Sequence, residues 1–145
     1  YDFTKAKTIK EGTAEGPMIG GNLSVFQYMP HTLPGEFWDG AIVFLEDCNE
    51  ELSRIDRMLI HLRRCGVFEK AAGIIFGDFG DLSDTGRPFG FTIEEILREH
   101  TNGCNGPVLM NAPFGHGKDL YTFPVGQRAV LSLAEKTKTL KLLNK

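Results

Sequence analysis

The sequence predicts an α/β domain with a mixed sheet, and three observations favour this fold class. Two apolar runs rich in β-forming residues, GAIVFLED (40–47) and AAGIIFGDF (71–79), flank a segment with helical periodicity. A second helix is expected over residues 92–100, followed by a short strand within residues 106–114. Residues 126–144 alternate apolar and polar side chains, which predicts an antiparallel hairpin. Parallel and antiparallel strands are therefore expected in one sheet.

The first expected elements lie in KTIKEGTAEGPMIGGNLSVFQYM, residues 7–29. We expect a strand, a Gly-rich turn, a short strand and a helix of one or two turns. This helix should begin near Asn22.

The strongest periodic segment is NEELSRIDRMLIHLRRCGVFE, residues 49–69, which predicts an amphipathic helix. Asn49 is expected to cap its start, and Gly66 suits its end. With the flanking strands, this helix completes a right-handed βαβ unit. Its apolar side chains recur at steps of three and four residues, at Leu52, Ile55, Met58, Leu59, Leu62 and Cys65.

The later elements have clear local signals. Thr92 with Glu95 three residues later predicts a capping box at the start of the second helix. The preceding stretch GDLSDTGRPFGF (80–91) is polar and contains Gly and Pro, so it should form a surface loop.

Length and composition indicate one globular domain over residues 1–145. A formal charge of -3 gives no basic field for nucleic acid, and no apolar run is long enough to cross a membrane. Three widely spaced cysteines fit free thiols in a reducing compartment, so we expect a cytoplasmic protein. Because the chain starts without Met or a signal peptide, we expect a piece of a longer protein.

Two carboxylates follow the first buried strand, Glu46 and Asp47. Ligands of open α/β sheets usually bind at the carboxyl ends of strands. A carboxylate placed after five apolar residues should be partly desolvated and should need a partner. Either side chain could instead cap the following helix, and that alternative is stronger for Asp47 than for Glu46.

His116 lies between Gly115 and Gly117, just beyond the strand PVLM. It is therefore expected at the same rim of the sheet as Glu46. A histidine held by a carboxylate can act as a general base at neutral pH, whereas a lone loop histidine is more often an ordinary surface residue. The two glycines would allow a tight turn and leave space beside the imidazole. His31, His61 and His100 receive no functional assignment.

A nucleophile is harder to find. Ser24 lies outside any GxSxG motif and at a helix start, where capping is the better interpretation. Cys48 stays a weak alternative. The Gly-rich stretch EGPMIGGNLS lacks both phosphate-loop patterns, and His and Cys show no metal-ligand spacing, so we expect no cofactor and no metal. Within that stretch, Gly20, Gly21 and Asn22 are candidate substrate-binding residues.

Four motifs in this order, GPMIGGNLS, GAIVFLEDCNEELSRIDRMLIHLRRCGVF, AAGIIFGDF and APFGHG, resemble the serine L,D-carboxypeptidases, the muramoyltetrapeptide carboxypeptidase family. The resemblance runs from about Gly12 to the C-terminal hairpin and covers only the family's C-terminal domain, which has a swivelling β/β/α fold. It implies a Ser-Glu-His triad in which FLED supplies Glu46 and FGHG supplies His116. The serine would come from the N-terminal domain, which is absent from this chain and would be its partner.

The resemblance further implies hydrolysis of the amide to a terminal D-amino acid in murein tetrapeptides during cell-wall recycling. A related branch of the family inactivates the peptide-nucleotide antibiotic microcin C, and a non-catalytic muropeptide-binding module is a further alternative. We expect no hydrolysis by the isolated chain, because it lacks the nucleophile. Apolar surface left by the missing domain would favour a homodimer.

Overall fold

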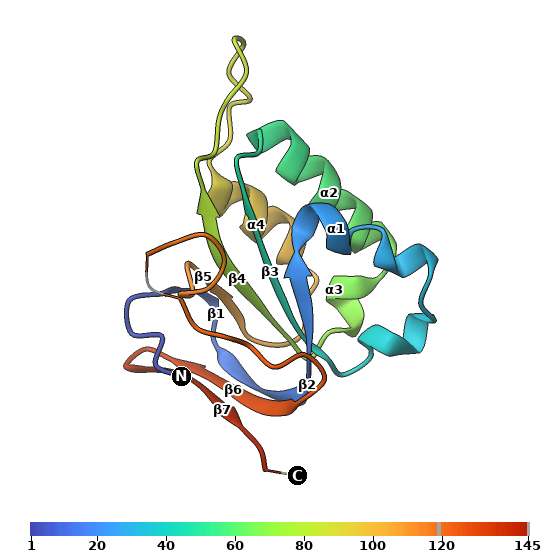
Figure 1. The fold of residues 1–145 in the computed structure, drawn as a ribbon, viewed down its shortest axis with the longest axis vertical. Helices are drawn as coiled ribbons and strands as arrows, with labels where there is room; N and C mark the ends of the chain where they lie inside the picture. Colours follow the sequence, from blue (N-terminus) through green and yellow to red (C-terminus); the bar gives the residue numbers. More distant parts are fainter. Residues whose placement is uncertain (119, 145) are drawn as a thin grey trace.

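The computed structural model describes residues 1–118 and 120–144, whose strands form one mixed seven-stranded sheet (Figure 1). The strand order is β1-β5-β4-β3-β2-β6-β7. The four central strands β2 to β5 run parallel, and β1, β6 and β7 are antiparallel to their neighbours, so the predicted mixed α/β sheet is confirmed. The strands are β1 (Lys7–Lys10), β2 (Gly12–Asn22), β3 (Ile42–Cys48), β4 (Gly73–Gly80), β5 (Val108–Met110), β6 (Arg128–Ala134) and β7 (Thr137–Leu142).

The helices follow the strands in the expected places. The predicted βαβ unit is β3-α2-β4, and the predicted capping box of Thr92 and Glu95 begins α4. Gly66 adopts a left-handed conformation with φ 75° directly after α2, as its position predicts. The helices are α1 (Leu23–Phe26), α2 (Leu52–Arg64), α3 (Val67–Lys70) and α4 (Ile93–Thr101), with 3₁₀ turns η1 (Met29–His31) and η2 (Gly35–Trp38).

The start of α2 differs from the prediction. Asn49 does not cap this helix, since the N-cap residue is Glu51 and makes no side-chain capping bond. Asn49 instead takes φ 58°, and its N–H donates to the carbonyl of Gly80. The backbone carbonyl of Ser83 accepts a hydrogen bond from the Leu52 N–H. The loop 80–91 thus supplies a partner for one of the backbone N–H groups at the start of α2.

The Gly-rich turn expected near the N-terminus is also wrong, because β2 runs unbroken from Gly12 to Asn22. Its glycines allow close packing against neighbouring backbone. A Cβ atom on Gly16 would lie 1.9 Å from the carbonyl oxygen of Gly40, and one on Gly20 would lie 1.8 Å from that of Phe44. The first half of β2 pairs with β6 and the second half with β3.

Two apolar cores lie on opposite faces of the sheet. Alternation along β3 explains the division, since Val43 and Leu45 face the helices while Ile42 and Phe44 face the other side. The helical side holds α2 and α4, whereas the β6–β7 hairpin and the N-terminal segment close the second core. In Figure 1 the hairpin curls beneath the parallel strands.

The loop 80–91 is mostly exposed and extends beyond the end of β4, as predicted (Figure 1). In residues 1–118 and 120–144, no helix combines the length and apolar character needed to cross a membrane.

Candidate active site

The carboxyl end of β3 presents two adjacent carboxylates to opposite faces of the sheet. Glu46 and Asp47 are both buried, with 8% and 3% of their surface exposed. The pairing of β3 with β4 is irregular between Leu45 and Asp47, which places a bulge beside Glu46. Successive residues of a strand alternate in direction, so the two acids can serve different partners.

Glu46 contacts His116, and the two residues are 70 positions apart in the sequence. Its Oε2 lies 2.8 Å from the Nδ1 atom of the imidazole. The His116 side chain is 53% exposed, whereas that of Glu46 is 10% exposed. A carboxylate on Nδ1 favours the tautomer with its proton on that atom, which leaves Nε2 able to accept a proton. The pair therefore combines a fixed acid with an accessible base.

The glycines beside His116 allow the loop to approach the ends of β3 and β4. A Cβ on Gly115 would lie 2.9 Å from Glu46 Oε2, and one on Gly117 would lie 2.7 Å from Asp78 Oδ2. Gly115 also has φ 107°, which side-chain-bearing residues rarely adopt. Close approach and backbone conformation together thus require Gly115, whereas at Gly117 the close atom is the end of the Asp78 side chain, which can move.

Aromatic side chains pack together at the base of the loop that carries His116. Phe114 is 6% exposed, and its ring centroid lies 5.7 Å from that of Phe44 and 4.7 Å from that of Phe123. Phe44 belongs to β3, two residues before Glu46. The same cluster therefore anchors both the strand with the acid and the loop with the base.

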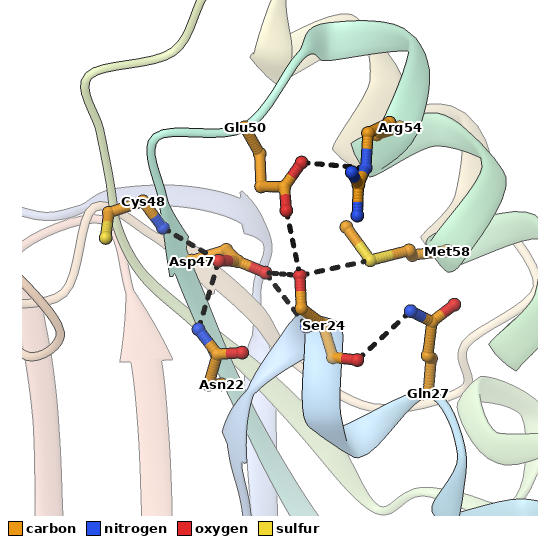
Figure 2. Close-up of polar contacts among 8 residues, drawn as sticks. All are labelled: Asn22, Ser24, Gln27, Asp47, Cys48, Glu50, Arg54 and Met58. Carbon is orange, nitrogen blue, oxygen red and sulfur yellow. Dashed lines mark hydrogen bonds and ion pairs between the residues drawn. The ribbon is translucent and has the colours of Figure 1, made fainter.

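Asp47 has a structural environment on the helical face (Figure 2). Its Oδ2 accepts hydrogen bonds from the Ser24 N–H at 2.9 Å and the Ser24 hydroxyl at 2.8 Å. Its Oδ1 accepts from Asn22 Nδ2 at 3.0 Å and from the Cys48 N–H at 2.9 Å. Asp47 therefore holds the start of α1, so the alternative that it caps the helix after β3 is wrong.

Ser24 also departs from expectation. The N-cap of α1 is Asn22, whose side chain accepts from the Val25 N–H, so Ser24 is not the capping residue. The Ser24 hydroxyl also lies 3.1 Å from Glu50 Oε1, and the other oxygen of that carboxylate pairs with Arg54 (Figure 2). Within residues 1–118 and 120–144, its hydrogen-bond partners are two carboxylates and a thioether and include no histidine, so it lacks the histidine base of a triad.

The candidate substrate-binding residues lie at the end of β2, beside Glu46. Asn22 pairs with Glu46 in the strand register. The position next to Gly21 is open, because a Cβ atom on this glycine would meet no other described atom within 4 Å. Gly20 and Asn22 have structural roles, in strand packing and in capping α1. Their binding role stays a prediction.

Cys48, the other nucleophile considered, ends β3. Partial burial raises the pKa of its thiol, and the charges of Glu46, Asp47, Asp81 and Glu50 raise it further. A raised pKa disfavours the reactive thiolate.

Sequence reasoning missed Asp78, which lies at the bulge of β4 beside Gly117. Its position in GDF, at the carboxyl end of an apolar strand, is the signal that could have found it. Its N–H donates to the carbonyl of Phe114 at 2.9 Å, so this backbone bond attaches the His116 loop to β4.

Comparison with known proteins identifies relatives of this chain. A protein from Bacillus subtilis named "Probable murein peptide carboxypeptidase" is 35% identical over 129 residues, covering 87% of this chain and 40% of that protein. The microcin self-immunity protein of Escherichia coli is 30% identical, covering 86% of the chain and 36% of that protein. The crystal structure of muramoyltetrapeptide carboxypeptidase from Oxalobacter formigenes matches with a TM-score of 0.82 at 30% identity.

That structural match covers 96% of this chain and 48% of the Oxalobacter chain. The chain therefore spans less than half the length of these relatives. The family of LD-carboxypeptidase C-terminal domains matches residues 15–131. By this match and by its fold, the chain belongs to the LD-carboxypeptidase C-terminal domain family.

Proposed function

We propose that this chain supplies the glutamate and histidine of a Ser-Glu-His triad in a serine-type L,D-carboxypeptidase. The central observation is the 2.8 Å contact between Glu46 Oε2 and His116 Nδ1. The exposure of the imidazole and the burial of the carboxylate support the same roles. An orienting acid is best shielded from water, whereas a base must reach its reactant.

In the proposed reaction, His116 Nε2 removes the proton from a serine hydroxyl on a preceding domain. The serine oxygen attacks the scissile amide carbonyl, and collapse of the tetrahedral intermediate breaks the C–N bond. The imidazolium returns the proton to the leaving D-amino acid, and an acyl-enzyme remains. His116 then activates a water molecule that hydrolyses this ester. Glu46 orients the ring and offsets its charge at both stages.

The proposed substrate is a murein tetrapeptide with a terminal D-amino acid, processed in the cytoplasm during cell-wall recycling. The printed names of the Bacillus and Oxalobacter relatives support this substrate class. The nucleophile and the oxyanion donors belong to the proposed N-terminal partner domain, so the isolated chain should bind or position substrate without cleaving it.

The test uses the complete protein and measures release of D-alanine from a murein tetrapeptide. Glu46→Gln should lower kcat about 10²–10⁴-fold with little change in the unfolding transition, because the amide no longer stabilises the imidazolium. His116→Ala should lower kcat at least as much. Glu15→Gln is the matched control, since Glu15 is an exposed carboxylate on β2 that pairs with Arg128.

A kcat of Glu46→Gln equal to that of the wild type would reject the proposed triad. Saturable tetrapeptide binding with no hydrolysis by the complete wild-type protein would instead favour a non-catalytic muropeptide-binding module.

A second candidate function is hydrolysis of microcin-type peptide-nucleotides. The 30% identity to the Escherichia coli microcin self-immunity protein favours it. The same Glu46–His116 pair would serve both reactions, so variants of these residues do not separate them. Measuring both substrates does separate them. A kcat/KM at least about 100-fold higher for the murein tetrapeptide or for the peptide-nucleotide identifies which of the two the enzyme hydrolyses.

A further inference from the structure

Three side chains with metal-binding atoms meet at the C-terminal end of α2. They are His31, the last residue of η1, and His61 and Cys65, one helical turn apart at the end of α2. Their ligand atoms all lie within 4.8 Å of one another. We propose that these three residues form a zinc site that fixes η1 to α2.

The spacing of the three atoms fits a shared ion. Tetrahedral zinc, with Zn–N bonds of about 2.0–2.1 Å and Zn–S bonds of about 2.3 Å, holds two nitrogens about 3.3 Å apart and a nitrogen and a sulfur about 3.6 Å apart. His31 Nε2 lies 3.1 Å from His61 Nε2, and His61 Nε2 lies 3.7 Å from Cys65 Sγ. Two of the three distances thus need changes of only a few tenths of an ångström.

The contact between the two imidazoles supports the same conclusion. Two Nε2 atoms at 3.1 Å cannot both carry a proton, because the two N–H groups would point at each other. Without an ion, one ring must donate to the other. With an ion, both Nε2 lone pairs would face the metal, which requires the rings, now stacked with their planes 28° apart, to turn toward a common point.

The scaffold positions the ligands well. His61 and Cys65 are four residues apart on a helix, and the Cys65 N–H bonds the His61 carbonyl at 3.0 Å, so both side chains project from one face. Cys65 and Leu33, two residues after His31, both pack against the helical core. His31 itself is exposed and has room to close the remaining distance to Cys65.

The ligand set selects the metal. Two imidazoles and one thiolate suit zinc and other borderline or soft ions, whereas magnesium and calcium need oxygen ligands. Three protein ligands leave the fourth tetrahedral position for water or an added ligand. This site uses no residue assigned to the triad, so it does not depend on the proposed function.

The first test is metal titration of the 145-residue chain, which forms two apolar cores. We expect one equivalent of Co²⁺ to produce the d–d absorption of a tetrahedral site together with a thiolate-to-cobalt charge-transfer band, and Zn²⁺ to displace it. Zinc at about 100 times its dissociation constant should raise Tm by roughly 5–10 °C, because it binds the folded state.

Variants assign the ligands. Cys65→Ser should remove the charge-transfer band, and His61→Ala and His31→Ala should each weaken binding at least about 10-fold. His31→Ala changes an exposed side chain, so it tests the site even if a helix variant folds poorly. Cys48→Ser is the matched control and should keep both spectrum and affinity, since Cys48 lies outside the cluster.

The proposal is overturned if the chain shows no saturable binding of Co²⁺ or Zn²⁺. It is also overturned if the cobalt spectrum lacks a thiolate band, or if His31→Ala and Cys65→Ser bind as tightly as the wild type.

Discussion

Gly115 lies so close to Glu46 that a Cβ atom on it would be 2.9 Å from the carboxylate oxygen Oε2. The same oxygen lies 2.8 Å from His116 Nδ1. Gly115 thus limits where the Glu46 carboxylate can lie, and a methyl group at position 115 would push that carboxylate away from His116.

Gly115→Ala in the complete protein should therefore lower kcat at least about 10-fold and lower the unfolding free energy by about 1–3 kcal/mol. Gly90→Ala is the matched control, because Gly90 also has positive φ, 90°, but no described atom lies near its Cβ position. It should lose stability and keep kcat. Equal losses of kcat in the two variants would show that strain alone, and not contact with Glu46, is responsible.

Asp47→Asn should lower the unfolding free energy of the chain by about 1–3 kcal/mol. The Asp47 carboxylate accepts four hydrogen bonds, and an amide in its place turns an NH₂ group toward donors. Urea denaturation measures the change. Glu15→Gln, which breaks the exposed pair with Arg128, should cost less than about 1 kcal/mol. A loss for Asp47→Asn no larger than that of the control would contradict the structural role of this carboxylate.

Thr92→Ala should destabilise the chain by about 0.5–2 kcal/mol, since it removes the hydroxyl that accepts from the Glu95 N–H and donates to the Glu95 carboxylate. The other half of the capping box, from the Thr92 N–H to that carboxylate, remains. Thr92→Ser keeps the hydroxyl and should retain most of that stability. Thermal unfolding of the three proteins distinguishes the outcomes, and identical Tm values for Ala and Ser would exclude a capping contribution.

Cys48 should react slowly with iodoacetamide at neutral pH. Its thiol pKa is raised, so the thiolate forms only at higher pH, and the alkylation rate should rise at a pH above that of an ordinary thiol. Asp81→Asn removes one contributing charge and should shift the rate profile to lower pH. Glu135→Gln makes the same charge change in the turn between β6 and β7 and should leave the profile unchanged. Mass spectrometry of the Cys48 peptide gives the rate, and a profile at or below ordinary thiol pH would contradict this expectation.

Local patterns predicted the elements whose signals are local. The periodicity of α2, the Thr92 box and the alternation of β6 and β7 are each written within a few neighbouring residues. The contact of Glu46 with His116 could be anticipated because both follow strands of one parallel sheet, whose carboxyl ends share an edge.

Other features depend on tertiary structure and could not be predicted. The glycines of β2 looked like a turn because their function is to admit the carbonyls of Gly40 and Phe44, which belong to a distant segment. Asn49 does not cap α2, because the backbone carbonyl of Ser83 accepts a hydrogen bond from Leu52 at the start of that helix. His31 is 30 residues from His61, so no sequence spacing indicated that they meet.

Strand β2 belongs both to the parallel layer and to the antiparallel part of the sheet that carries the β6–β7 hairpin. Its N-terminal half is hydrogen-bonded to β6 and its C-terminal half to β3. Detaching either the hairpin or the parallel strands would therefore break backbone hydrogen bonds of β2. The domain should consequently unfold as one cooperative unit, with amide protons of Ala14 and Ile19 exchanging with solvent only through the same global opening.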